Sequence, residues 1–105
     1  MTTAKQAVST IEQAIRKNLR PECKFTVELT KERGKNGEAS EIELKATIEG
    51  SDSPFTDKTA FEKAIYVEKT QPAGKDNKEW LYTGKIEGMK YNLRMYTGKA
   101  PTTAA

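Results

Sequence analysis

The first apolar pattern along the chain has the spacing of an amphipathic helix. Thr3 is followed three residues later by Gln6, a pair that predicts a capping box at the start of the helix. Pro21 disfavours helical backbone at Arg20, so the helix should end near residue 18 or 19. The apolar residues in between recur every three or four positions and predict one buried face, made of Ala4, Ala7, Val8, Ile11, Ala14, Ile15 and Leu19.

After Pro21 the period of the pattern changes to two, which predicts strands with one face in water. Apolar and polar residues alternate over residues 23–30 and again over residues 41–48. Asn36-Gly37 lies between the two runs and predicts a type I′ hairpin turn, because both central residues of that turn need positive φ. If Lys35 faces Glu38, the inner pairs are all apolar: Leu29 with Leu44, Val27 with Ala46 and Phe25 with Ile48. The outer pairs are then Glu28 with Lys45, Thr26 with Thr47 and Lys24 with Glu49.

The same alternation predicts a second hairpin over residues 80–96, with its turn around Gly88-Met89. Glu87 is placed opposite Lys90, which sets Ile86 against Tyr91, Gly84 against Leu93 and Tyr82 against Met95 on the inner side. The outer side then carries Leu81, Thr83, Lys85, Asn92, Arg94 and Tyr96. A glycine inside a strand indicates a bulge or a close backbone approach, for example where the helix crosses Gly84.

The stretch between the hairpins, residues 50–78, fits two interpretations, because its apolar residues match both a short helix and a strand. The preferred interpretation has a loop through residues 50–54, a helical turn near residues 57–62 and a strand over about residues 64–69. Gln71-Pro72-Ala73-Gly74 should end that strand.

A chain of 105 residues has room for one hydrophobic core. The predicted fold is therefore α+β, with one N-terminal helix packed on a four- or five-stranded antiparallel sheet built from two hairpins. Residues 1–97 should form a single domain and residues 98–105 a flexible C-terminal tail.

Charge is distributed unevenly along the chain. The net charge is +3, from 18 Lys and Arg against 15 Asp and Glu. Residues 1–24 carry five cations and two anions, residues 25–66 six and nine, and residues 67–105 seven and four. We therefore expect an acidic middle segment between basic ends.

Several classes of chemistry receive no support from the composition. The chain has no histidine, and its one cysteine, Cys23, excludes an internal disulfide. Cys23 has the parity of the inner residue Phe25, so it is predicted to be a small buried hydrophobe rather than a nucleophile. Neither a metal pattern nor a cofactor fingerprint is present, and no enzymatic activity is expected. The sequence has no membrane span or signal peptide, which makes a cytoplasmic location and no membrane partner the default expectation.

Two patches on the sheet are candidate binding sites. In the predicted register Glu32 lies opposite Glu41, with Glu28 and Glu43 on the same outer face. Such an acidic patch is interpreted first as solvated surface and, as a functional alternative, as a docking site for a basic partner. The second patch is a basic one on the outer face of the C-terminal hairpin, formed by Leu81, Lys85, Lys90, Arg94 and Tyr96.

The resulting hypothesis is a small non-catalytic binding protein that acts through protein–protein contacts at this basic patch, since exposed aromatic and Arg residues dominate binding energy. By association, an inhibitor or regulatory accessory protein of the phage or mobile-element type would have this size. The alternative hypothesis is nucleic-acid binding by the same cations. A homodimer formed by pairing of two edge strands is a further hypothesis, because few prolines protect the edges of the sheet.

Overall fold

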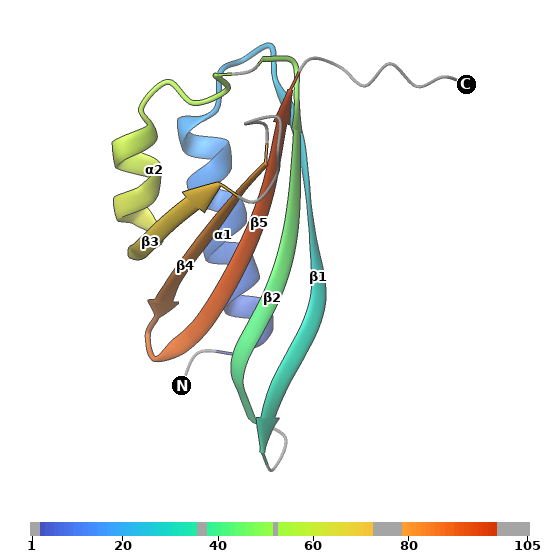
Figure 1. The fold of residues 1–105 in the computed structure, drawn as a ribbon, viewed down its shortest axis with the longest axis vertical. Helices are drawn as coiled ribbons and strands as arrows, with labels where there is room; N and C mark the ends of the chain where they lie inside the picture. Colours follow the sequence, from blue (N-terminus) through green and yellow to red (C-terminus); the bar gives the residue numbers. More distant parts are fainter. Residues whose placement is uncertain (1–2, 36–37, 52, 73–78, 99–105) are drawn as a thin grey trace, which may run out of the picture.

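The computed structural model describes residues 3–35, 38–51, 53–72 and 79–98, which form a two-layer α+β domain. The five strands make one sheet in the order β1-β2-β5-β4-β3, and the two helices share a core with one face of it (Figure 1). The elements in chain order are α1 (Ala4–Asn18), β1 (Lys24–Lys35), β2 (Glu38–Glu49), α2 (Lys58–Ala64), β3 (Val67–Pro72), β4 (Glu79–Ile86) and β5 (Met89–Gly98).

Helix α1 begins and ends where the sequence predicts. The Gln6 backbone N–H donates to Thr3 Oγ1 at 3.1 Å and the Thr3 N–H donates to Gln6 Oε1 at 2.9 Å, which completes the capping box. Asn18 is the last helical residue. The predicted stripe faces the sheet: Ala4, Ala7, Ile11, Ala14 and Ile15 are buried, and Val8 and Leu19 pack against them partly buried.

The sheet is mixed, so the prediction of an all-antiparallel sheet was wrong. β2 and β5 are parallel neighbours, with Ile42 opposite Tyr91 and Leu44 opposite Leu93, and this pairing joins the two hairpins into one sheet. The chain leaves β2, passes through α2 and β3, and returns so that β5 runs in the direction of β2 (Figure 1). Alternation within each strand reports which face a residue occupies and carries no information on the direction of a distant neighbour.

The first hairpin keeps the predicted register from Lys24 to Leu29 and then departs from it. A register shift after Leu29 places Arg33 opposite Glu41 and Glu32 opposite Ile42, so the predicted Glu32–Glu41 pair was wrong. A second shift, after Arg33, restores the predicted pairing of Lys35 with Glu38. The first shift is favourable because it places opposite charges, in place of like charges, across the two strands. The predicted turn at Asn36-Gly37 lies outside the described residues.

The second hairpin has the predicted faces in a register shifted by two residues. Ile86 pairs with Met89, and the turn consists of Glu87 and Gly88, with φ of 47° and 86°. These values meet the requirement of a two-residue type I′ turn, which fixes the register. The placement of the turn at Gly88-Met89 was therefore wrong, but a shift of two leaves every side chain on its predicted face.

The middle segment contains both a helix and a strand. Asp57 caps α2, with its carboxylate accepting from the Ala60 N–H at 3.0 Å. The chain then turns through Tyr66, at φ 53°, before β3. β3 starts later than predicted and includes Gln71 and Pro72, which were expected to end it. Pro72 is tolerated because β3 is an edge strand.

The ends of the described chain add two points. β5 includes Gly98, the first residue of the predicted tail, and residues 99–105 lie outside the described residues. Neither of the two described helices is long and apolar enough to cross a membrane.

Candidate binding surface

The face of the sheet opposite the helices is here called the outer face. None of the described helices or loops packs on it (Figure 1). Along β5 the residues alternate between buried and exposed: Tyr91, Leu93 and Met95 point into the core, whereas Arg94 and Tyr96 point outward. The described part of the chain therefore leaves this five-stranded sheet face available for contact with another molecule.

All five residues of the predicted basic patch lie on this outer face. Leu81 of β4 is directly opposite Arg94 of β5, and Lys85 is directly opposite Lys90. Tyr96 follows Arg94 on the same side of β5 and is 40% exposed. Leu81 is half-buried, which gives the patch an apolar base between its charged side chains. The faces are correct despite the register error, because the shift was even.

The parallel pairing of β2 with β5 adds residues that sequence reasoning missed. Lys45 of β2 lies opposite Arg94, and Thr47 lies opposite Tyr96. Lys45 was predicted to face outward, but only the pairing of two strands far apart in the sequence reveals that it adjoins the patch. The outer face thus holds two like-charge neighbours, Lys45 with Arg94 and Lys85 with Lys90. Like charges directly opposite each other are destabilising.

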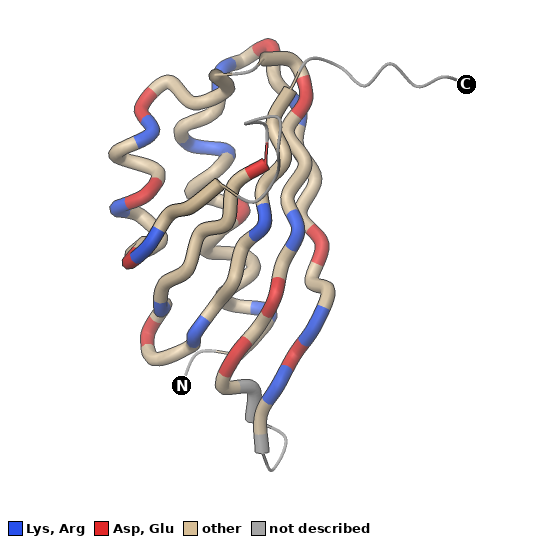
Figure 2. The backbone as a smooth tube through the Cα atoms, viewed as in Figure 1, with Lys and Arg blue, Asp and Glu red and all other residues tan. Residues whose placement is uncertain are grey.

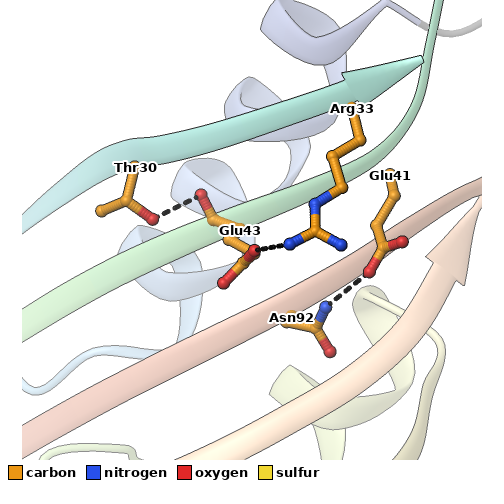
Figure 3. A network of polar contacts seen from close by, with 5 residues as sticks. All are labelled: Thr30, Arg33, Glu41, Glu43 and Asn92. Carbon is orange, nitrogen blue, oxygen red and sulfur yellow. Dashed lines mark hydrogen bonds and ion pairs between the residues drawn. The ribbon is translucent and has the colours of Figure 1, made fainter.

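The predicted acidic patch is dispersed. Arg33 Nη2 lies 3.6 Å from Glu43 Oε2, and Asn92 Nδ2 donates to Glu41 Oε2 at 3.0 Å (Figure 3). These contacts connect β1, β2 and β5 through outer-face side chains. Glu28 lies opposite Lys45, which leaves no run of unbalanced carboxylates.

Glu32 does not belong to the outer face. It lies opposite Ile42, an inner-face residue, near the end of the hairpin that projects past α1 (Figure 1). Its side chain is exposed. The register shift after Leu29 thus removes Glu32 from the four predicted members of the acidic patch.

Charges of both signs are interspersed over the sheet (Figure 2). The guanidinium of Arg94 lies 3.8 Å from Glu79 Oε1, with 57% of the Arg94 side chain exposed. Such a surface ion pair contributes little to stability. Arg94 therefore lies beside Glu79 with more than half of its side-chain surface in water.

The buried titratable side chains among the described residues are Cys23, Tyr82 and Tyr91. Cys23 is buried, as predicted, and this burial raises the pKa of its thiol, which keeps it protonated. Burial raises the pKa of Tyr82 to about 12, and raises that of Tyr91 as well. The Tyr91 hydroxyl donates to the Ile65 carbonyl at 2.8 Å, so this buried group has a structural partner. Within the described ranges, no three Cys, Asp or Glu side chains gather as a metal site.

Comparison of the chain with known protein families, with curated proteins and with solved structures finds no match.

Proposed function

We propose that this protein is a non-catalytic binding domain that docks another protein on the outer face of its sheet. The observation that carries the proposal is the adjacency of Leu81, Arg94 and Tyr96 on an uncovered face. Exposed aromatic and Arg side chains are the residues that most often dominate binding energy, and a half-buried leucine beside them adds apolar area. An inhibitory or regulatory accessory role would act through this same surface.

The charge pattern favours a protein partner over a nucleic acid. Glu79 lies against Arg94, and Glu41 lies opposite Lys90. A phosphate backbone crossing this face would meet these carboxylates as well as the cations. A protein surface can match both signs. Tyr96 is also the sole aromatic residue on the described outer face, which gives a single-stranded chain little to stack on.

Nucleic-acid binding remains the second candidate because of one specific observation. The pairs Lys45 with Arg94 and Lys85 with Lys90 place like charges in direct opposition, and phosphates would relieve that repulsion. Binding of this kind should weaken steeply as the salt concentration rises.

Affinity capture with matched baits tests the first candidate. The baits are the wild-type protein, Tyr96→Thr on the outer face, and Tyr66→Asn, which removes a tyrosine that is 62% exposed away from that face. Asparagine suits position 66 because it tolerates positive φ. We expect a protein that the wild type and Tyr66→Asn capture and that Tyr96→Thr loses.

The captured protein is then purified and its affinity measured for each bait. A loss of about 2 kcal/mol at an aromatic hot spot corresponds to roughly 30-fold weaker binding by Tyr96→Thr. Equal affinities for the wild type and Tyr96→Thr would refute docking at this position.

Fluorescence anisotropy of labelled single-stranded and duplex oligonucleotides decides the second candidate. Tight binding that weakens with salt and is lost in Lys45→Gln and Lys90→Gln would replace the protein-binding proposal with the nucleic-acid one. Absence of binding at low salt would exclude the nucleic-acid candidate.

A further inference from the structure

A cavity of about 320 Å³ lies on the helix side of the sheet, on the side opposite the outer face. Its walls come from the loop before α2, from α2 itself, from β4 and, at Thr97, from β5. Phe55, Trp80 and Tyr82 supply aromatic surface, Pro54 supplies a further apolar wall, and Lys58 supplies the charge. The cavity opens to solvent, and aromatic walls with one charged group are a lining typical of sites for small molecules.

The aromatic wall is built into the core. The Phe55 ring stacks on the ring of Phe61, with centroids 4.4 Å apart and an angle of 13° between the planes. Phe61 in turn meets Tyr82 edge-on at 5.8 Å. Phe61 and Tyr82 are 0% and 2% exposed. The wall is therefore positioned by packed rings, without help from a ligand.

The loop that carries Phe55 is tied to the end of α1. The Arg20 backbone N–H donates to the Pro54 carbonyl at 2.8 Å, and Arg20 Nε donates to the Ser53 carbonyl at 2.7 Å. Beyond Phe55, the Thr56 N–H donates to the Asn18 carbonyl at 2.8 Å. These bonds hold both sides of the loop, so the cavity is preformed and a ligand would spend little binding energy on ordering it.

Lys58 gives the cavity its charge preference. Its Nζ lies 4.9 Å from the centre of the Trp80 ring, a cation–π contact that fixes the ammonium at the aromatic wall. Within the described part of the chain, no carboxylate lies within ion-pair distance of Lys58. The ammonium thus lies over an aromatic surface and has no ion-pair partner among the described carboxylates.

We infer that this cavity is a binding site for a small planar aromatic carboxylate. The ring would pack against Phe55, Trp80 and Tyr82, and the carboxylate would accept hydrogen bonds from the Lys58 ammonium. At about 320 Å³ the cavity is at the lower end of the range for small-molecule sites, roughly 300–1,000 Å³, so one- and two-ring compounds fit. The site lies apart from the outer face, and its occupancy does not depend on the proposed protein docking.

Trp80 makes the inference directly testable, because it is the one tryptophan in the chain and gives a single indole N–H signal. The probes are naphthalene-2-carboxylate and the uncharged naphthalene-2-carboxamide, each titrated into ¹⁵N-labelled protein. We expect a saturable shift of the Trp80 indole signal, with the carboxylate binding about tenfold more tightly through its charge-assisted contact.

Two lysine variants isolate the charge. In Lys58→Gln the affinity for the carboxylate should fall to that for the carboxamide. In Lys63→Gln, on the same helix and outside the cavity, it should stay at the wild-type value. The inference is overturned if the Trp80 signal shows no saturable shift with the carboxylate, or if the tenfold preference survives in Lys58→Gln.

Discussion

Replacing Gly84 with alanine tests the contact between β4 and the segment that follows α2. A Cβ atom at this position would lie 2.4 Å from the backbone oxygen of Tyr66 and 2.8 Å from the hydroxyl of Tyr91. Tyr91 is fixed by its bond to the Ile65 carbonyl at 2.8 Å, and Val67 pairs with Gly84 at the start of β3. The new methyl group must therefore displace backbone rather than the end of a flexible side chain.

The expected cost follows from three effects. Overpacking a close contact costs about 1–3 kcal/mol. Disruption of the buried Tyr91–Ile65 hydrogen bond adds roughly 1–3 kcal/mol. The smaller conformational freedom of alanine in the unfolded chain returns about 0.5–1 kcal/mol. We expect Gly84→Ala to lower the free energy of unfolding by roughly 3 kcal/mol, a large fraction of the stability of a small domain.

Urea unfolding followed by circular dichroism measures this loss as a lower midpoint with an unchanged slope. Gly98→Ala is the matched control, because the nearest atom to its new Cβ would be in the Tyr96 ring at 3.7 Å, an ordinary contact. The control should stay within about 0.5 kcal/mol of the wild type. The reasoning fails if Gly84→Ala is as stable as the wild type, or if both variants lose the same amount.

Three further perturbations test other parts of the fold. Thermal unfolding of Tyr91→Phe should show a loss of about 1–3 kcal/mol, because the buried Ile65 carbonyl loses its donor. The same assay on Asp57→Ala should show a loss of about 1 kcal/mol, since the carboxylate that caps α2 at the Ala60 N–H is removed. Burial raises the pKa of Tyr82 from 10.0 to about 12, so the unfolded chain releases a proton that the fold retains. The free energy of unfolding should therefore fall as the pH rises from 10 to 12, because the unfolded chain loses the Tyr82 proton first. Below pH 10 both states keep this proton and Tyr82 should cause no such fall. A series of urea midpoints measures the change.

Each of the three has a control that separates the named interaction from general damage. Tyr96→Phe removes an exposed hydroxyl and should leave stability unchanged, and an equal loss in both tyrosine variants would contradict the role of the buried bond. Asp57→Asn retains a capping side chain and should recover most of the loss, so an Asn variant as unstable as the Ala variant would contradict the cap. In Tyr82→Phe the fall in stability above pH 10 should become shallower, and an unaltered pH profile would contradict its assignment to Tyr82.

Local signals in the sequence were sufficient for the first helix and for the faces of the strands. The Thr3 and Gln6 side chains satisfy each other's backbone within one turn, so the start of α1 is readable without tertiary information. The parity of Arg94 and Tyr96 against Leu93 and Met95 likewise identified the outer face of β5, because burial of one face imposes a period of two.

The pairing of strands was less predictable, for a physical reason in each case. An even shift in the second hairpin preserves every face, so alternation could not exclude the wrong turn before Glu87 and Gly88 were seen at positive φ. The register shift after Leu29 changes which charged residues of β1 and β2 face each other. Such a shift cannot be seen in the alternation of either strand alone. The parallel β2–β5 pair joins segments about fifty residues apart, and no local pattern encodes its direction.

These limits decide how much of each candidate site could be predicted. The outward placement of the five residues of the basic patch could be predicted because it depends only on the faces of one hairpin. Lys45 was not assigned to it, since its contact with Arg94 depends on the parallel pair. The aromatic cavity was missed because no local pattern brings Trp80 together with residues of another element. The approach of Phe55 and Lys58 to it depends on the path of the loop before α2.

The outer face, centred on Leu81, Arg94 and Tyr96, is the docking surface that we propose. The most direct test is a ¹H–¹⁵N correlation spectrum of the labelled protein, titrated with the partner protein recovered by the wild-type bait. We expect amide shifts and line broadening to concentrate on outer-face positions of β4, β5 and β2, with α1 and α2 unaffected. Perturbations centred on the exposed sides of the two helices, with Leu81, Arg94 and Tyr96 unchanged, would contradict it.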